Sequence, residues 1–231
     1  MKNYCLAIIP ARSGSKGIKD KNIKRLNGKP LIYYSIKEAK KSKFIDKLIV
    51  STDSKKIKTI ALQLGAEAPF LRPKNLATDK TGMYPVIRHA VDYLEKKGEK
   101  FNIILILQPT SPLRTAIDID KAVVKLINSK ADSVVSLCLA EHSPYWMRII
   151  KKDKVHPFIK SRQYLRRQDL PKVYRMNGAI YVFKRSVLIN QKSILGKDTR
   201  PLIMTPENSI DIDTVTDLEF AGIALRKRLK N

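Results

Sequence analysis

The chain has 231 residues, of which 43% are hydrophobic, and a formal net charge of +25. That length suits one main domain with an elaboration, and the hydrophobic share is ordinary for a folded protein, which excludes an intrinsically disordered chain. The charge would suit a nucleic-acid-binding protein, but the lysines are spread over nearly every predicted helix, as on a solvated surface.

Cysteine content and hydropathy indicate the cellular compartment in which the protein is expected. Cys5 and Cys138 each lie inside an apolar run, which favours reduced core thiols over a disulfide or a metal cluster. No apolar stretch reaches the roughly 18 residues of a membrane span. The first apolar run ends at Pro10 without a signal-peptide cleavage pattern. We therefore expect a cytoplasmic protein with no membrane partner.

Short apolar runs alternate with segments of helical spacing along the chain. The runs are apolar on both faces, as in buried parallel strands. They cover residues Cys5–Ile9, Leu48–Val50, Ile103–Leu107, Val134–Leu139 and Ala179–Phe183. Apolar residues recur at helical spacing from Ile57 to Leu64 and from Met83 to Leu94. This alternation predicts an α/β fold with a doubly wound, mostly parallel sheet, in a single domain over residues 1–231.

The alternation is interrupted after Leu139. Residues 141–175 are basic, aromatic and rich in turns. We interpret them as an insertion that extends the sheet or reaches a partner subunit, and we expect a homodimer. Helical spacing returns at the end of the chain, where Thr214 and Asp217 have the spacing of a capping box.

The loop after the first predicted strand is the first candidate site. Ligands of open parallel sheets bind beyond the carboxyl ends of the strands, and this loop, residues 10–22, reads PARSGSKGIKDKN. Its glycines allow close backbone approach, and its hydroxyls, amides and cations can face an anion. The spacing is neither that of a Walker loop nor that of the three-glycine dinucleotide fingerprint. The composition predicts a phosphate-binding loop, with a flexible basic surface loop as the alternative.

The segment IIPARSGSKGIKDKNI, followed by GKPLIYYSI, resembles the opening of the nonulosonate cytidylyltransferases, the family that makes CMP-sialic, CMP-legionaminic and CMP-pseudaminic acid. The resemblance implies a Rossmann-like nucleotidyltransferase fold and CTP as the donor. A further element, FLRP with LATD, implies a contact between Arg72 and the base. The residues of the loop that the resemblance places at the nucleotide are Ala11, Arg12, Ser13, Ser15, Lys16, Lys21 and Asn22.

Gln108 follows the predicted strand Ile103–Leu107 in the segment QPTSPLR. Two prolines make this turn rigid, and the side-chain amide of Gln108 can both donate and accept hydrogen bonds. A tight turn followed by a helix cap is the alternative. The segment LQPTSPLR resembles a second element of the family, which implies that Gln108 contacts the sugar acid.

A basic stretch from Arg166 to Tyr181 is the third candidate site. Arginine forks bind carboxylates at two points, and a sugar acid presents a carboxylate. A basic surface patch or a dimer-contact loop is the alternative. The segments RQDLP and NGAIY resemble family elements. They imply sugar recognition by Arg167, Arg175, Asn177 and Tyr181.

Asp211 and Asp213 lie in the segment SIDIDT before the last predicted helix. Side chains alternate in extended backbone, so both carboxylates share one face while Ile210 and Ile212 face the core. Magnesium takes one or two carboxylates together with waters and phosphate oxygens. The pair predicts a Mg²⁺ site, and the segment also resembles the family's metal motif. A helix cap at Asp213 is the alternative.

Together these elements predict a cytidylyltransferase that activates a nine-carbon sugar acid with CTP and releases pyrophosphate. Charge neutralisation and positioning would provide most of the catalysis. Residues Tyr145–Met147 stand where some sialic-acid enzymes carry a Lys, so the exact sugar stays open. The alternatives are a cytidylyltransferase for an eight-carbon sugar acid and a basic nucleic-acid-binding protein; we expect no nucleic-acid partner. The predicted catalytic residues are Arg12, Lys16, Lys21 and Asp211.

Overall fold

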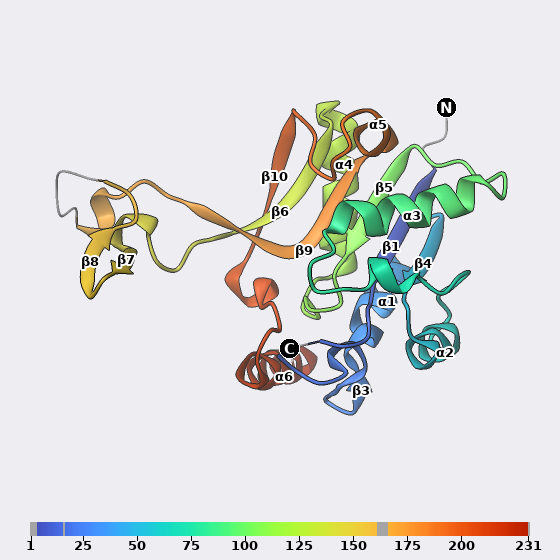
Figure 1. Ribbon diagram of the computed structural model, residues 1–231, viewed down its shortest axis with the longest axis horizontal. Helices are drawn as coiled ribbons and strands as arrows, with labels where there is room; N and C mark the ends of the chain where they lie inside the picture. Colours follow the sequence, from blue (N-terminus) through green and yellow to red (C-terminus); the bar gives the residue numbers. More distant parts are fainter. Residues whose placement is uncertain (1–3, 16, 161–165, 231) are drawn as a thin grey trace.

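The centre of the molecule is a mixed sheet whose six strands, counted over the described residues, have the order β10-β6-β9-β5-β1-β4 (Figure 1). The computed structural model describes residues 4–15, 17–160 and 166–230, without the side chains of residues 167, 229 and 230. Strands β4, β1 and β5 are parallel, as are β6 and β10, whereas β9 is antiparallel to both β5 and β6. The predicted α/β fold with a mostly parallel sheet is confirmed. The strands are β1 (Cys5–Pro10), β4 (Lys47–Ser51), β5 (Ile103–Leu107), β6 (Ser133–Leu139), β9 (Tyr174–Lys184) and β10 (Thr199–Met204).

Helices cover both faces of the sheet. One face carries α1 (Leu31–Lys41), α2 (Lys55–Gln63) and α4 (Ala116–Ser129), and the other carries α3 (Met83–Glu95) and α5 (Arg185–Asn190). Successive strand residues serve opposite faces, so in β1 Ala7 and Ile9 pack on the first face while Leu6 and Ile8 pack on the second. Because both faces are buried, the strands read as continuous apolar runs rather than as alternating ones.

The last helix, α6 (Val215–Lys230), packs on the loop that follows β1 rather than on the sheet. Its buried residues contact Ile18 and Leu113, beside the short hairpin of β2 (Arg25–Leu26) and β3 (Lys29–Pro30). The predicted capping box is confirmed, since the Asp217 amide donates to Thr214 Oγ1 at 3.2 Å and the Thr214 amide donates to the Asp217 carboxylate at 2.7 Å. The helix thereby ties the end of the chain to its beginning.

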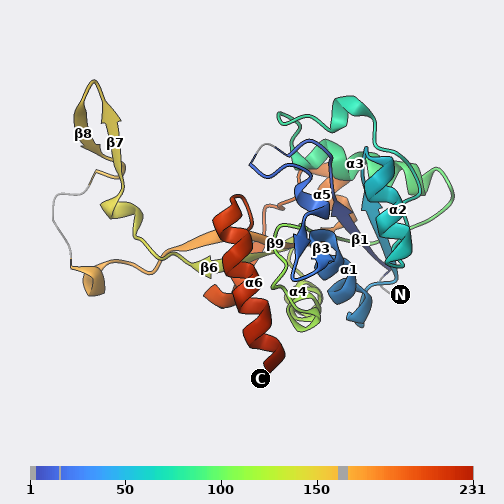
Figure 2. The same ribbon diagram turned by 90° about the horizontal axis from the view of Figure 1, so that it is seen from below.

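The described residues between β6 and β9 leave the body of the molecule as an arm (Figures 1 and 2). The described parts of the arm, residues 140–160 and 166–173, hold the hairpin of β7 (Arg148–Lys151) and β8 (Lys154–Pro157), with 3-10 turns at Pro144–Trp146 and Arg167–Asp169. Every residue of the hairpin is exposed. The predicted insertion therefore reaches outward and does not extend the main sheet.

Strand β9 leaves its ladder with β6 at residues 177–180. Val135 pairs with Tyr181 and Leu137 pairs with Met176, so these four residues of β9 lie opposite Ser136 alone. The Ser136 hydroxyl fills the interruption, because it donates to Asn177 Oδ1 at 2.6 Å and accepts from the Ile180 amide at 2.8 Å. We call residues 177–180 the β9 bulge; bulges commonly re-aim a strand beside a functional site.

Two remaining predictions concern the cysteines and the membrane, and one strand at the sheet edge was not predicted. Cys5 and Cys138 are free and buried, as expected, and burial, with help from Asp46, raises the pKa of the Cys5 thiol to about 12. None of the helices in the described part of the chain has the length and apolar character needed to cross a membrane. Strand β10 was not predicted, because Pro201 interrupts its pattern; the edge position tolerates a proline.

Candidate active site

A cavity of about 440 Å³ opens at the carboxyl ends of β1 and β5. This is the end of an open α/β sheet at which ligands bind. Its walls are the loop after β1, the segment before α3, the turn after β5 and the segment before α6. The cavity brings together seven residues of the predicted nucleotide, sugar and metal sites, which are Arg12, Ser15, Lys21, Asn22, Arg72, Gln108 and Asp213.

Arg12 lies at the mouth of the cavity. Its Nη2 pairs with the carboxylate of Asp79 on the opposite wall, and its Nη1 donates to Gly14 O at 3.2 Å. The Arg12 side chain remains 31% exposed. An anion that enters the cavity can therefore reach the guanidinium.

Asp53, which the sequence analysis did not single out, anchors the start of the same loop. Its carboxylate accepts hydrogen bonds from the Ser13 amide at 2.8 Å and from the Ser13 hydroxyl. Partial burial acts to raise the pKa of Asp53, but the hydrogen bonds from Ser13 outweigh it and hold the pKa below its ordinary value. Asp53 follows β4 closely, so its place near a strand end was the signal that could have found it.

Four further predicted loop residues differ in their placement. Ala11 is fully buried, and its amide donates to Ser51 O at 2.9 Å. Asn22 lines the cavity, yet its Nδ2 donates to the Arg12 carbonyl at 2.8 Å, so it also holds the loop in shape. Ala11 and Ser13 do not line the cavity, and the two amides and the Ser13 hydroxyl are engaged within the protein. Their predicted nucleotide contacts stay predictions. Lys16 lies outside the described residues.

Arg72 lines the cavity from a buried position and is only 5% exposed. Its guanidinium donates to the carbonyls of Ser51 and Leu76. Burial lowers the pKa of Arg72 to about 10, with Asp53 acting in the opposite direction. The group stays cationic at neutral pH and adds a fixed positive charge to the cavity. Its predicted contact with the base remains a prediction.

Gln108 lies over the backbone of Gly178 in the β9 bulge. A Cβ at Gly178 would be 2.7 Å from Gln108 Oε1 and 3.6 Å from Asp211 Oδ2, and the φ of 73° is unfavourable for any other residue. The alternative reading of this segment is also present, since Thr115 opens α4 with a capping box. The turn therefore starts a helix and places Gln108 in the cavity wall.

Asp211 and Asp213 differ in exposure and in partners. Asp211 Oδ1 is buried and has no hydrogen-bond partner among the described atoms, whereas Asp213 is 76% exposed and pairs with Lys21 Nζ at 2.8 Å. Burial raises the pKa of Asp211, and the nearby Asp213 carboxylate raises it further. A hydrogen bond from Thr110 acts to lower the pKa, but the net value stays above the ordinary one for aspartate. Thr110 also fixes the segment, because its carbonyl accepts from the Ile212 amide at 2.9 Å.

This carboxylate pair fits a hard divalent cation. An unpartnered buried oxygen beside a second carboxylate is unfavourable, and a bound cation would relieve both costs. Magnesium can be held by one or two carboxylates, since it completes its shell with waters and phosphate oxygens. The alternative role of Asp213 as the helix cap is wrong, because Thr214 is the N-cap residue of α6.

Arg175 and Tyr181, which both belong to β9, lie near Asp211. Arg175 is near enough to lower the pKa of Asp211, and its Nη2 donates to Ser209 O at 3.4 Å. Burial raises the pKa of the Tyr181 phenol, and the Asp211 carboxylate adds to this shift. Both predicted sugar residues thus interact electrostatically with Asp211. The side chain of Arg167 is outside the described residues.

Asn177 does not face the cavity. It is 1% exposed, its Oδ1 accepts from the Ser136 hydroxyl, and its Nδ2 donates to Ser209 Oγ at 2.8 Å. The structure does not support the predicted direct contact with the sugar acid, because both ends of the side-chain amide are hydrogen-bonded to buried serines. Asn177 instead holds the β9 bulge in shape.

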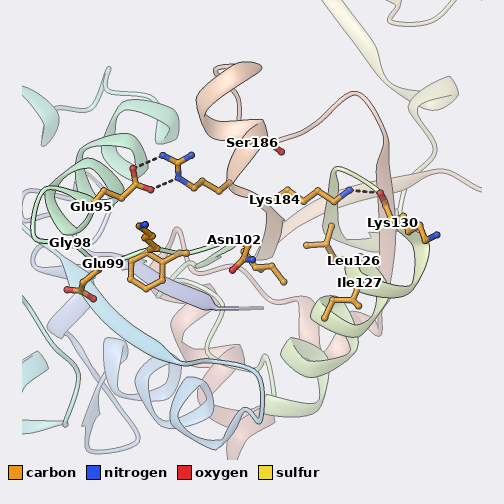
Figure 3. A pocket seen from close by; sticks show the side chains of 13 residues that line it. Glu95, Gly98, Glu99, Asn102, Leu126, Ile127, Lys130, Lys184 and Ser186 are labelled. Carbon is orange, nitrogen blue, oxygen red and sulfur yellow. Dashed lines mark hydrogen bonds and ion pairs between the residues drawn. The ribbon is translucent and has the colours of Figure 1, made fainter. Parts of the chain in front are cut away.

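A larger cavity, of about 850 Å³, lies at the amino end of β5 (Figure 3). Two contacts join its lining residues, since Arg185 pairs with Glu95 and Lys184 Nζ donates to Lys130 O. None of the predicted site residues that the structure describes lines it. Arg185 is therefore a control position, because it is an ion-paired arginine remote from the smaller cavity.

Comparisons with known proteins bear on the family and the fold of the chain. A family model described as cytidylyltransferase matches residues 6–222. A CMP-N,N'-diacetyllegionaminic acid synthase from Legionella pneumophila is 39% identical over 222 residues, which cover 92% of each chain. A pseudaminic acid cytidylyltransferase from Campylobacter jejuni is 35% identical over 227 residues, which cover 96% of each chain. A solved CMP:2-keto-3-deoxy-manno-octonic acid synthetase complexed with CTP has a TM-score of 0.74 over 98% of this chain and 100% of that chain; at 16% identity it shows a shared fold alone.

Proposed function

The chain belongs to the cytidylyltransferase family, and from this membership and its cavity we propose that it joins CTP to a nine-carbon sugar acid. The products are the CMP-sugar and pyrophosphate. The observation that carries the proposal is the convergence of Arg12, Lys21, Gln108 and Asp213 on one cavity at the carboxyl end of the sheet. We place the reaction in the cytoplasm, where the donor nucleotide is available.

The donor lies on the side of the cavity formed by the loop after β1. Arg12 and Lys21 face its phosphates, and Arg72 adds a buried positive charge. Phosphoryl-type transfer depends mainly on positioning and on neutralising the phosphate oxygens, so three fixed cations around one cavity suit a triphosphate.

The acceptor lies toward β9, beside Gln108, Arg175 and Tyr181. Its carboxylate suits the guanidinium of Arg175, and its hydroxyls suit the amide of Gln108. The anomeric hydroxyl attacks the α-phosphorus, so a new P–O bond forms as the bond to pyrophosphate breaks and the hydroxyl proton leaves.

We propose Asp211 and Asp213 as the ligands of Mg²⁺. When bound, the ion would neutralise phosphate oxygens of the donor. Lys21 now pairs with Asp213 at 2.8 Å and donates to Ile212 O at 2.7 Å. A cation on Asp213 would release the ammonium of Lys21 toward the phosphates.

The test is pyrophosphate release from CTP and Mg²⁺ with a panel of acids: sialic, legionaminic and pseudaminic acid and an eight-carbon sugar acid. We expect release with a nine-carbon acid and little with UTP or ATP as donor. Release with the eight-carbon acid alone would favour that alternative. No release with any acid, together with a gel shift of random DNA at physiological salt, would favour the nucleic-acid-binding alternative.

Arg12→Ala and Lys21→Ala are each expected to lower kcat/KM for CTP by about 100-fold, because each removes a charged donor from the phosphates. Steady-state kinetics at a saturating acceptor concentration measures this loss. Arg185→Ala is the control, since it breaks the remote pair with Glu95 and should leave kcat/KM unchanged. Wild-type efficiency in both cavity variants would show that the triphosphate binds elsewhere.

We also propose that the arm forms a homodimer. Its hairpin and the residue that follows it expose large apolar side chains, with Ile150 at 74%, Val155 at 67% and Phe158 at 58%. An isolated two-stranded hairpin is only marginally stable in water, and clustered exposed apolar groups are typical of interaction sites.

The double variant Ile150→Asp, Val155→Asp is expected to shift the protein from dimer to monomer at low micromolar concentration, because it places two charges in the interface. Sedimentation velocity measures the shift. Leu62→Asp on α2, where Leu62 is 52% exposed, is the matched control and should stay dimeric. A wild-type monomer, or an unchanged dimer in the double variant, would contradict this interface.

A further inference from the structure

Arg114 is a buried cation for which the proposed chemistry has no use so far. It is 1% exposed and stands just before α4, after the turn that carries Gln108. None of the ion pairs found among the described residues includes it. The carboxylates that act on it from a distance, Asp118 and Glu38, are engaged with the Thr115 cap and with Lys41. Burial lowers its pKa to about 10, so it is charged at neutral pH.

The guanidinium of Arg114 donates to three acceptors from three elements. Nη1 donates to Ala179 O at 2.7 Å and to Gln108 O at 3.2 Å, and Nη2 donates to Ser35 Oγ at 2.6 Å. Ser35, on α1, in turn donates to Gln108 O at 3.3 Å. Nε has no hydrogen-bond partner among the atoms that the structure describes. The contacts therefore converge on two backbone carbonyls, those of Gln108 and Ala179.

These two carbonyls lie where the β5–β9 ladder stops. The last paired residues are Leu107 and Ile180, and continuing the same register would pair Gln108 with Ala179. That pair does not form, because β5 turns at Pro109 while β9 enters its bulge. Nη1 of Arg114 bridges the two carbonyls instead and sets the spacing of the two strand ends.

Packing alone does not explain an arginine at this position. A buried cation without an ion-pair partner is generally less favourable than an apolar side chain of similar volume. A planar guanidinium, however, can hold the two carbonyls with one nitrogen and Ser35 with the other, which the single nitrogen of a lysine cannot reproduce.

We propose that Arg114 is a positioning residue for the sugar-acid acceptor: by holding the Gln108 carbonyl at a fixed distance from the Ala179 carbonyl, it sets the place of the Gln108 amide above Gly178. The amide lies close against Gly178, since a Cβ added at that residue would be only 2.7 Å from Oε1. Arg114 itself does not touch the acceptor. The inference deepens the proposed function and rests on it.

The experiment compares wild type, Arg114→Lys and Arg114→Ala in cytidylyl transfer, with melting temperatures measured in parallel. We expect KM for the sugar acid to rise about 10- to 100-fold in both variants, since small misplacements of a substrate-positioning group have effects of that size. KM for CTP should change less than about twofold, because the donor residues lie on other elements. Low millimolar guanidinium should partly restore KM for the acid in Arg114→Ala and leave wild type unchanged.

Arg185→Lys is the matched control, because it alters another arginine contact, the partly exposed and remote pair with Glu95, and should leave both KM values unchanged. Equal KM changes for both substrates, or no change in folded Arg114 variants, would overturn the positioning role alone. If neither Arg114 variant folds, Ser35→Ala decides: we expect KM for the acid to rise severalfold there, and an unchanged KM overturns the proposal. An inactive wild type overturns the proposed function, and the positioning role with it.

Discussion

Asp211→Asn and Asp213→Asn are each expected to lower kcat by at least about 100-fold, which corresponds to about 2.7 kcal/mol in the barrier. Asparagine keeps the size and the hydrogen bonding of the side chain, but it removes the charge that would hold Mg²⁺. Because Thr214 rather than Asp213 is the N-cap of α6, the loss of kcat in Asp213→Asn cannot be assigned to a missing helix cap. Steady-state kinetics over a magnesium titration measures the effect. Asp92→Asn, on the exposed face of α3, is the control and should be silent in kcat.

The same variants carry a second readout that does not depend on turnover. With CTP present and no acceptor, Mg²⁺ at about ten times its Kd should stabilise wild type by about 1.4 kcal/mol, or roughly 3–6 °C in melting temperature. The variants should lose that shift. Without metal, Asp211→Asn should melt at the same temperature or higher, because it removes a buried carboxylate whose pKa burial raises. Full magnesium-dependent activity in both variants would remove the metal assignment.

Gly178→Ala is expected to lower kcat/KM by at least about 100-fold, since a methyl group there would displace the Gln108 amide and crowd Asp211. Stability should fall by about 1–3 kcal/mol, because alanine is strained at this positive φ. Gly98→Ala separates the two effects: Gly98 has a φ of 87° and nothing within 4 Å of an added Cβ. It should lose similar stability and keep its activity. Matching activity losses in the two variants would show that strain, and not the displaced amide, is responsible.

Some features of this protein follow from residues that are near one another in the sequence. The strands Cys5–Ile9 and Ile103–Leu107 could be predicted because both faces are buried, so no polar residue interrupts them. The capping box at Thr214 depends only on local backbone geometry. The same holds for the loop after β1, whose composition and place after a strand predicted an anion site.

Other features depend on which segments meet, and local patterns carry no information about that. The direction of β9 is one, since an apolar strand between two others is buried whichever way it runs. Asn177 is another: its motif suggested a sugar contact, but the interruption of the β6 ladder turns its amide toward Ser136.

Charged groups show the same division between sequence and tertiary structure. Arg12, Arg72 and Arg114 are alike in composition, yet the first is exposed at the mouth of the cavity, the second lines it from a buried position and the third is enclosed behind Gln108. The sequence by itself determined that cations, an amide and two carboxylates follow the strand ends. Only the tertiary structure decided which of them face the cavity and which position the segments that line it. The reason is that the desolvation and hydrogen bonding of a charged group depend on partners from distant parts of the chain.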